Sequence, residues 1–431
     1  MTAGSRPAIR PARRASRRSP GPPAGRSAAR AWTGAWGAVF ACSWGGNQFS
    51  PLLLMYEQRA HYSELMVNSF LGVYVLGLAP ALLIAGPLSD IRGRRPVMLA
   101  GVGAAVAGSA LLALGPFGAV FLAAGRLLSG VTVGIALAVG SSWVKELSQA
   151  PFDDRADASS GARRAALAFS AGAALGALVA GLIAQWGPVP EVLPFGIHIA
   201  VTLPFAFVIR ALPETNADPL AGTALSGPLW RRLSIPGARH RRFVRVVALG
   251  APWIFGGAAV AYGYLPTELK GATGSWGLVF ATATTVVALG ASSLVQPLAK
   301  RLHSPGSARG LAAGVFLLAA GIACCVLAIA GQSVLGGLAA NVIVGAGLGI
   351  TMVSGLLEVQ AIAAPGDLAG LTGAFYALAY AGFLAPAVIS ALTSAVPAMV
   401  ILWVITGLAV ACWALILSAS RRHLPGARPA R

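Results

Sequence analysis

The feature that most constrains this 431-residue chain is a series of twelve apolar segments, each long enough to cross a lipid bilayer. An α-helix rises about 1.5 Å per residue, so about 20 residues span the hydrocarbon layer of about 30 Å. Only 10% of the residues are charged, whereas a soluble domain carries roughly 25%. We therefore expect an all-α membrane protein with lipid as its solvent. The predicted spans are residues 32–56, 66–86, 96–115, 117–143, 164–186, 190–210, 244–266, 276–298, 309–331, 333–358, 370–393 and 396–418.

The basic residues predict how these spans are oriented. Of the 32 Lys and Arg residues, 29 lie in the terminal tails, in loops on one predicted side of the membrane or at the span ends next to these loops. The positive-inside rule makes this side cytoplasmic, so we expect both termini there. The exceptions are Arg59 and Lys270, which lie in loops on the other predicted side of the membrane, and Arg126, which lies in the middle part of a span. The net charge of +19 thus reflects topology and contact with anionic lipid headgroups, rather than a nucleic-acid partner.

A long connection after the sixth span divides the chain into two similar halves. Three short segments recur with offsets of 211, 210 and 215 residues: 44–46 with 255–257, 87–90 with 297–300, and 130–135 with 345–350. This parallel repeat predicts two pseudo-symmetric six-helix bundles. We expect a disordered basic cytoplasmic tail (1–30), an N-terminal bundle (31–211), a cytoplasmic linker (212–243), a C-terminal bundle (244–420) and a second cytoplasmic tail (421–431).

The turn between the second and third spans carries a motif. Two glycines, an aspartate and three arginines make up this motif: Gly86, Asp90, Arg92, Gly93, Arg94 and Arg95. The pattern closely resembles the loop signature of the major facilitator superfamily, although Ile91 stands where that family has an Arg. The resemblance implies a twelve-helix secondary transporter in which this turn takes part in gating. The residues themselves indicate that Asp90 pairs with Arg92, with Arg94 or with a neighbouring helix; a plain charged turn is the alternative.

The fourth span holds a buried cation. Residues 125–134 resemble the fourth-helix signature of proton-linked superfamily members, which implies a coupling role for Arg126. An arginine within a span must face protein or water, because its charge is costly in lipid. Its depth matches that of Asn47 and Gln48 in the first span. We therefore predict a hydrogen bond from Arg126 to one of these amides or to a nearby carbonyl of the first helix; snorkelling to the membrane surface is the alternative.

Glycines predict close helix packing in the fourth and fifth spans. Gly130 and Gly134 lie one turn apart on one face of the fourth span. Gly172, Gly176 and Gly181 in the fifth span resemble an incomplete form of the motif typical of drug-efflux antiporters. Because the proline and one glycine of that motif are replaced by Ala, the resemblance weakens an assignment to export without removing it.

The coupling ion has two candidate carriers. Glu358 is an acid within a predicted span, near the cytoplasmic end of the tenth. It is the best candidate for binding a proton, and an ion-pair partner for the basic surface is the alternative. His198 in the sixth span could titrate, but a packed and hydrogen-bonded histidine is the more common case. If neither residue carries a proton, the protein is an uncoupled facilitator.

Polar and aromatic residues of three spans are candidates for the wall of a solute cavity. They are Trp44, Asn47, Gln48, Trp253, Tyr262, Tyr376 and Tyr380. Each could instead serve helix packing or anchor the chain at the membrane interface. A wall of amides and aromatic rings with few acids suits a neutral, amphiphilic or anionic solute better than a strongly cationic one.

The sequence predicts a transporter and no enzyme. It contains no phosphate-binding loop, no nucleophile motif and no cluster with metal-ligand spacing, so we expect no cofactor and no metal. We expect a monomer that moves a small solute across a bacterial cytoplasmic membrane by alternating access, coupled to protons, with export by antiport favoured. Proton symport, uncoupled uptake and a non-transporting sensor of the same fold are the alternatives.

Overall fold

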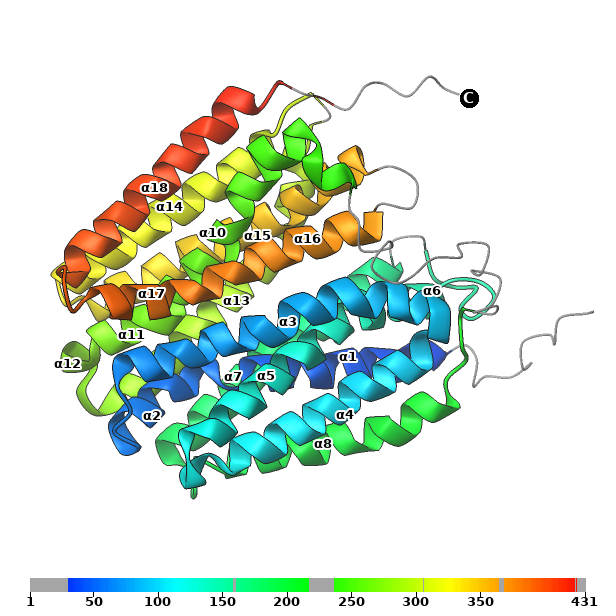
Figure 1. The fold of residues 1–431 in the computed structure, drawn as a ribbon, viewed down its shortest axis with the longest axis horizontal. Coiled ribbons are helices and arrows are strands. Elements are labelled where there is room, and N and C mark those ends of the chain that lie inside the picture. The colour runs from blue at the N-terminus through cyan, green and yellow to red at the C-terminus, as the bar shows by residue number, and fades with distance from the viewer. Residues whose placement is uncertain are drawn as a thin grey trace, which may run out of the picture.

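The computed structural model describes residues 30–157, 160–216, 236–304, 306–363, 368–422 and 424. The predicted N-terminal tail apart from residue 30, most of the predicted linker and most of the C-terminal tail lie outside these residues. Within them the regular structure is helical, apart from one isolated bridge between Ser304 and Ser307. The expected all-α fold is therefore confirmed (Figure 1).

The N-terminal half forms eight α-helices among the described residues. They are α1 (Ala31–Asn47), α2 (Leu53–Arg59), α3 (Glu64–Arg92), α4 (Arg94–Ala113), α5 (Ala119–Ile135), α6 (Ser141–Leu147), α7 (Ser160–Trp186) and α8 (Leu193–Ala211). A π-helical turn, Ala136–Gly140, joins α5 to α6, so these two form one crossing. The first crossing is broken, because α1 leads through the 3-10 turn Ser50–Leu52 into α2.

The C-terminal half contains nine α-helices among the described residues. They are α10 (Ala248–Ala258), α11 (Leu265–Glu268), α12 (Lys270–Thr273), α13 (Gly277–Leu302), α14 (Arg309–Ala330), α15 (Val334–Ile362), α16 (Leu368–Ala381), α17 (Ala385–Leu392) and α18 (Ala398–Ala419). Eleven helical stretches of the described chain are long and apolar enough to span a membrane. The 17-residue α1, continued by α2, supplies the twelfth predicted crossing.

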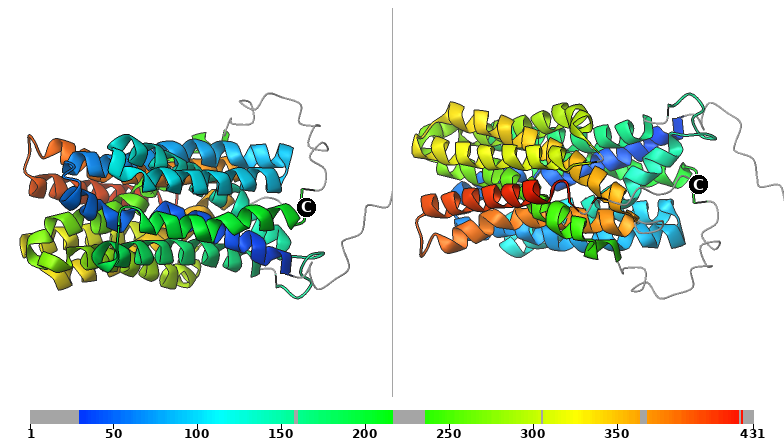
Figure 2. Two further views of the ribbon diagram at one scale, coloured as in Figure 1. Left: turned by 90° about the horizontal axis from the view of Figure 1, so that it is seen from below. Right: turned by 90° about the horizontal axis from the view of Figure 1, so that it is seen from above.

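The helices form two bundles that lie side by side along the long axis of the molecule (Figures 1 and 2). The bundle of α1 to α8 lies below that of α10 to α18 in Figure 1. The start of α1 and the end of α18 lie at the same end, which we call the termini end. The opposite end, where α2, α11 and α12 lie, we call the far end. An even number of crossings places both termini on one side.

Glycines bring equivalent helices together in the two halves. A Cβ atom on Gly130 of α5 would overlap the backbone carbonyl of Tyr74 in α3. In the other half, a Cβ atom on Gly345 of α15 would overlap the carbonyl of Ala288 in α13. These positions need glycine because the helix backbones touch there. The same packing therefore recurs at the two copies of the sequence repeat.

The glycines of α7 face two different neighbours. Gly172 and Gly176 lie against the backbone of α1, at the carbonyls of Phe40 and Trp44. Gly181, near the far end, lies against Thr282 of α13 in the opposite half. The glycines of this incomplete motif thus allow α7 to pack closely against α1 in its own bundle and against α13 in the other bundle.

Replacing Gly130 with alanine should destabilise the protein by about 1–3 kcal/mol, because α3 and α5 would have to separate. Gly103→Ala is the matched control: Gly103 lies in α4, and the added methyl group would meet no heavy atom within 4 Å. Thermal unfolding of the two purified variants in detergent measures the difference. Equal melting temperatures for both variants would contradict the tight α3–α5 contact.

Polar contacts join the two halves at the far end. Lys270 Nζ lies 2.8 Å from Glu57 Oε1, between α12 and α2. Ser390 of α17 accepts a hydrogen bond from Asn68 Nδ2 at 2.9 Å and donates one to Glu64 Oε1 at 2.7 Å. The neighbouring segments 52–56 and 260–265 are buried. The far end of the interface is therefore closed.

Candidate functional site

Arg126 of α5 lies in the interior with 1% of its surface exposed. Its Nη1 atom donates a hydrogen bond to the carbonyl of Gly46 in α1 at 3.1 Å. Its Nε atom donates a longer bond to the carbonyl of Phe70 in α3 at 3.4 Å. The cation thus contacts a carbonyl of the first helix, one of the partners expected from its depth, and not the side chain of Asn47 or Gln48.

Two aromatic rings enclose the guanidinium of Arg126. Its Cζ atom lies 4.4 Å from the ring centroid of Tyr74 and 4.9 Å from that of Phe49. Such contacts stabilise a cation by electrostatic attraction to the ring faces. None of the ion pairs formed within the described residues includes Arg126. Carbonyl dipoles and ring faces surround this charge, but no carboxylate neutralises it there.

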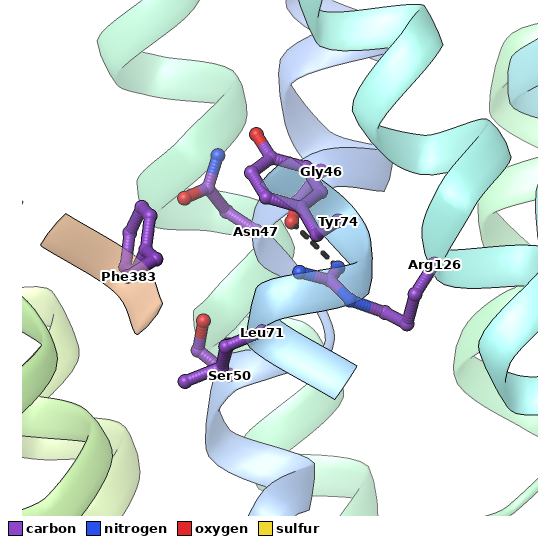
Figure 3. Close-up of a pocket in the computed structure, with 7 residues that line it drawn as sticks. All are labelled: Gly46, Asn47, Ser50, Leu71, Tyr74, Arg126 and Phe383. Atoms are coloured by element: carbon purple, nitrogen blue, oxygen red, sulfur yellow. Dashed lines mark hydrogen bonds between the residues drawn. The ribbon is translucent and has the colours of Figure 1, made fainter. Parts of the chain in front are cut away.

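A small cavity of about 10 Å³ lies beside the guanidinium, close to the space that one water molecule needs (Figure 3). Six of its lining residues belong to the N-terminal half and Phe383, in the 3-10 turn Gly382–Leu384, belongs to the other. The cavity therefore lies at the interface of the two bundles. The lining residues are Gly46, Asn47, Ser50, Leu71, Tyr74, Arg126 and Phe383.

Stacked aromatic side chains adjoin this cavity from the C-terminal half. Phe255 of α10 stacks on Tyr380 at 4.1 Å between ring centroids and on Phe383 at 4.9 Å. Tyr74 of α3 meets Tyr380 and Phe383 edge-on, each at 6.2 Å. Tyr74 therefore touches both the guanidinium and the aromatic cluster, and it connects the two halves at this depth.

The predicted wall residues are distributed over several places. Asn47 lines the cavity, and its Nδ2 atom donates to the Ser43 carbonyl at 3.0 Å. Gln48 is directed elsewhere, since its Nε2 atom donates to Ser109 Oγ in α4 at 3.1 Å. Tyr380 belongs to the adjoining aromatic cluster. The remaining four residues are not among those that line this cavity: Trp44, Trp253, Tyr262 and Tyr376.

Five lining residues were not predicted from the sequence: Gly46, Ser50, Leu71, Tyr74 and Phe383. Tyr74 and Phe383 carry a usable signal, since each is an aromatic residue near the middle of its span. Gly46 contributes its carbonyl, and no side-chain pattern reports on a carbonyl.

His198 of α8 lies in a hydrogen-bond network inside the N-terminal bundle. Its Nδ1 atom is 2.7 Å from Ser109 Oγ, and its Nε2 atom is 2.9 Å from the Ala41 carbonyl in α1. Thr202 Oγ1 lies 3.0 Å from the same Nε2 atom. This matches the packed and hydrogen-bonded alternative, and the network fastens α1 to α4 and α8.

Glu358 of α15 forms an ion pair near the termini end. Both of its oxygens accept hydrogen bonds from Arg242, at 2.6 Å from Nε and 2.9 Å from Nη2. Both side chains are buried. The geometry is that of the ion-pair alternative, with a single dedicated arginine as the partner.

The turn between α3 and α4 has the charge arrangement expected of its motif. Arg94 Nη1 lies 2.9 Å from Asp90 Oδ1, and Arg94 Nη2 lies 3.0 Å from Glu146 Oε1 at the end of α6. Gly93 adopts a φ of 93°, which favours glycine. The arginine therefore connects α3, α4 and α6 at the termini end.

Residues 35–386, most of the chain, match the family model of the Major Facilitator Superfamily. The chain belongs to this superfamily. Transporters of the superfamily are not enzymes, and membership supports a multi-pass membrane protein that acts as a secondary transporter. No match to a curated protein was found.

Solved structures of superfamily transporters have the same fold. A peptide transporter POT in complex with sulfate is similar with a TM-score of 0.74 and 14% identity, covering 92% of this chain and 96% of that chain. A POT family transporter in complex with 5-aminolevulinic acid gives 0.72 and 12%, covering 91% and 96%. The xylose transporter XylE from E. coli, partially occluded and inward open, gives 0.68 and 14%, covering 91% and 98%. At these identities the likeness shows the fold alone.

The superfamily turn has a further partner that the sequence did not indicate. Glu214, just after α8, accepts hydrogen bonds from the backbone nitrogens of Arg94 at 2.8 Å and Arg95 at 2.9 Å. A carboxylate at this place satisfies the free N–H groups at the start of α4 and interacts favourably with the positive end of the helix dipole. A side chain on Gly93 would collide with Glu214. The start of the long connection is thereby fastened to the turn.

Proposed function

We propose that this superfamily member moves a small solute by alternating access, with the solute bound beside Arg126 between the two bundles. The observation that carries the proposal is the cavity around a buried cation at the interface. Alternating access requires a site that each bundle lines in part, and Phe383 lies opposite the six N-terminal residues. In this cycle the pathway closes at one end of the interface at a time, and the polar contacts at the far end form the closure at that end.

We further propose a cytoplasmic-membrane protein with both termini in the cytoplasm, which the distribution of Lys and Arg supports. In that orientation the closed far end faces outward, and the solute reaches the site from the cytoplasm. Loading from this side is compatible with export, the direction that we favour. The fourth-helix signature around Arg126 supports coupling to protons.

An uncoupled facilitator is the second candidate, and specific contacts favour it. Glu358 is engaged by Arg242 on both oxygens, and His198 has hydrogen-bond partners on both ring nitrogens. Either group would have to exchange these partners to carry a proton through the cycle. Coupling through Glu358 therefore requires the ion pair to open once in each cycle.

Transport by purified protein in liposomes distinguishes these proposals. A library of small solutes is presented with and without an imposed pH gradient, and with and without a protonophore. A coupled exporter should accumulate at least one solute only while the gradient persists. A facilitator should equilibrate its solute at the same rate in all conditions. A library in which no solute moves faster than in empty liposomes would contradict transport.

A further inference from the structure

The two halves make the same contact with chemically different residues. In the N-terminal half, Arg126 of α5 donates to the Gly46 carbonyl of α1. In the C-terminal half, Asn341 of α15 donates to the Ala261 carbonyl at 2.9 Å. The donor residue and the acceptor residue are each 215 positions apart in the two halves, from 126 to 341 and from 46 to 261. The fourth helix of each bundle thus reaches a carbonyl of that bundle's first helix.

The comparison shows that this contact does not need a charge. Asn341 is fully buried and also donates to the Gly337 carbonyl at 2.9 Å, so a neutral amide makes the contact in one half. A buried cation is much more costly than a buried amide. The additional charge on Arg126 must therefore serve something other than the contact between the two helices.

The surroundings of Arg126 show what would neutralise it. Elsewhere among the described residues, the buried or half-buried arginines 94, 164 and 242 each pair with a carboxylate, whereas the half-buried Arg95 donates to the Leu212 carbonyl. Arg126 has only carbonyls and ring faces, and its Nη2 atom has no hydrogen-bond acceptor among the described residues. Figure 3 shows the guanidinium reaching past Tyr74 to the side of the cavity where Asn47 and Ser50 lie. The cavity holds about one water molecule, so an anion can enter it only when the two bundles separate and widen it, and the anion would then meet the Nη2 group.

We propose that Arg126 recognises the carboxylate of an organic anion, and that the apolar body of this anion lies against Tyr74 and Phe383. The proposal rests on the transport function and names its substrate class. A guanidinium presents paired donors that match the two oxygens of a carboxylate. Asn47 and Ser50 line the same cavity as additional polar groups. The adjoining rings of Phe255 and Tyr380 extend the apolar wall. A cationic solute would be repelled by the unneutralised charge.

Binding to the purified full chain in detergent tests this without any gradient. The probes are benzoate, phenylacetate and hexanoate, each beside its neutral amide and the corresponding amine, with sodium chloride and sodium sulfate as inorganic anions. At least one carboxylate should raise the melting temperature saturably, with an affinity at least about 10-fold above that of its amide. No preference for any carboxylate over its amide, or equal stabilisation by sulfate, would overturn the proposal.

Variants locate the preference at the cation. Arg126→Gln should abolish the preference for the carboxylate, while Arg126→Lys should keep part of it, since the charge remains without the paired donors. Asn341→Ala removes the symmetric contact but no charge, so the preference should persist. An unchanged preference in folded Arg126→Gln protein would overturn the site; if that variant does not fold, unchanged affinity in Arg126→Lys would do so.

Failure of the site and failure of the transport function give different results. If a carboxylate binds in the Arg126-dependent way but is not moved in liposomes, the transport proposal fails and the anion site stands. If a neutral solute is moved equally by the natural protein and by Arg126→Gln, transport stands and the anion site fails.

Discussion

Cross-linking position 68 to position 390 should stop transport completely, and reduction of the link should restore it. Asn68 of α3 and Ser390 of α17 are hydrogen-bonded at 2.9 Å across the far end of the interface. If the solute leaves through this end, the two side chains must separate in every cycle. The variant carries Asn68→Cys and Ser390→Cys in a chain whose natural cysteines are replaced by alanine. A bifunctional methanethiosulfonate reagent makes the link, and solute flux in liposomes is measured before linking, after linking and after reduction.

A second pair at the same end provides the matched control. The Gln332 side chain donates to the Glu268 carbonyl at 3.5 Å, and both residues belong to the C-terminal half. Linking Glu268→Cys to Gln332→Cys should leave transport unchanged, because rocking of one bundle against the other does not alter distances within a bundle. Full transport by the linked 68–390 pair would contradict alternating access through the far end. Equal inhibition by both links would attribute the loss to the reagent.

The number and position of the membrane crossings could be predicted from the sequence, because span length is fixed by the bilayer. The predicted span 309–331 corresponds to Arg309–Ala330, and 333–358 to Val334–Ile362. The interruption between α1 and α2 was missed, although Pro51 within the apolar run is a signal for the 3-10 turn Ser50–Leu52. Hydrophobicity reports that a segment lies in lipid, but not whether its helix is continuous.

The repeat was found in the sequence, but its register in the first and seventh spans was not. Sequence similarity paired Gly46 with Gly257, whereas the hydrogen bonds of Arg126 and Asn341 pair Gly46 with Ala261, one helical turn further along. Small residues recur at each turn of such helices, so a shift by one turn preserves the pattern. The contact to the fourth helix resolves this ambiguity.

The composition of the site was predicted only where charge and depth were decisive. Arg126 could be placed because a buried cation is rare and its depth can be counted along the span. Tyr74 and Phe383 were missed because helices that are apolar all round do not show which face meets the other bundle. Arg242 was not identified as the partner of Glu358, since 116 residues separate them and tertiary packing alone selects this arginine among the basic residues nearby.

The second large effect is expected from the buried pair of Arg242 and Glu358. Replacing one member leaves the other as an unneutralised charge in the interior, which costs about 3–5 kcal/mol. Arg242→Met should be the more damaging change, because Arg242 Nη1 also donates to the carbonyls of Ser420 and Arg422 at 3.1 Å each. These bonds fasten the end of α18 to the start of the seventh crossing. Unfolding of the purified variants in detergent measures the loss of stability.

The double variant Arg242→Met with Glu358→Met should be more stable than either single variant, because no buried charge remains and methionine fills similar volume. Lys270→Met is the exposed control, since its ion pair with Glu57 is half solvent-exposed and such pairs contribute at most about 1 kcal/mol. A double variant as unstable as the sum of the single variants would contradict a mutually neutralising pair.

Transport by the double variant distinguishes the two possible roles of Glu358, proton carrier and ion-pair partner. A carboxylate that carries the coupled proton cannot be replaced by methionine, so flux in the double variant would no longer respond to the protonophore. A carboxylate that only neutralises Arg242 can be replaced together with it, and coupled flux would then persist.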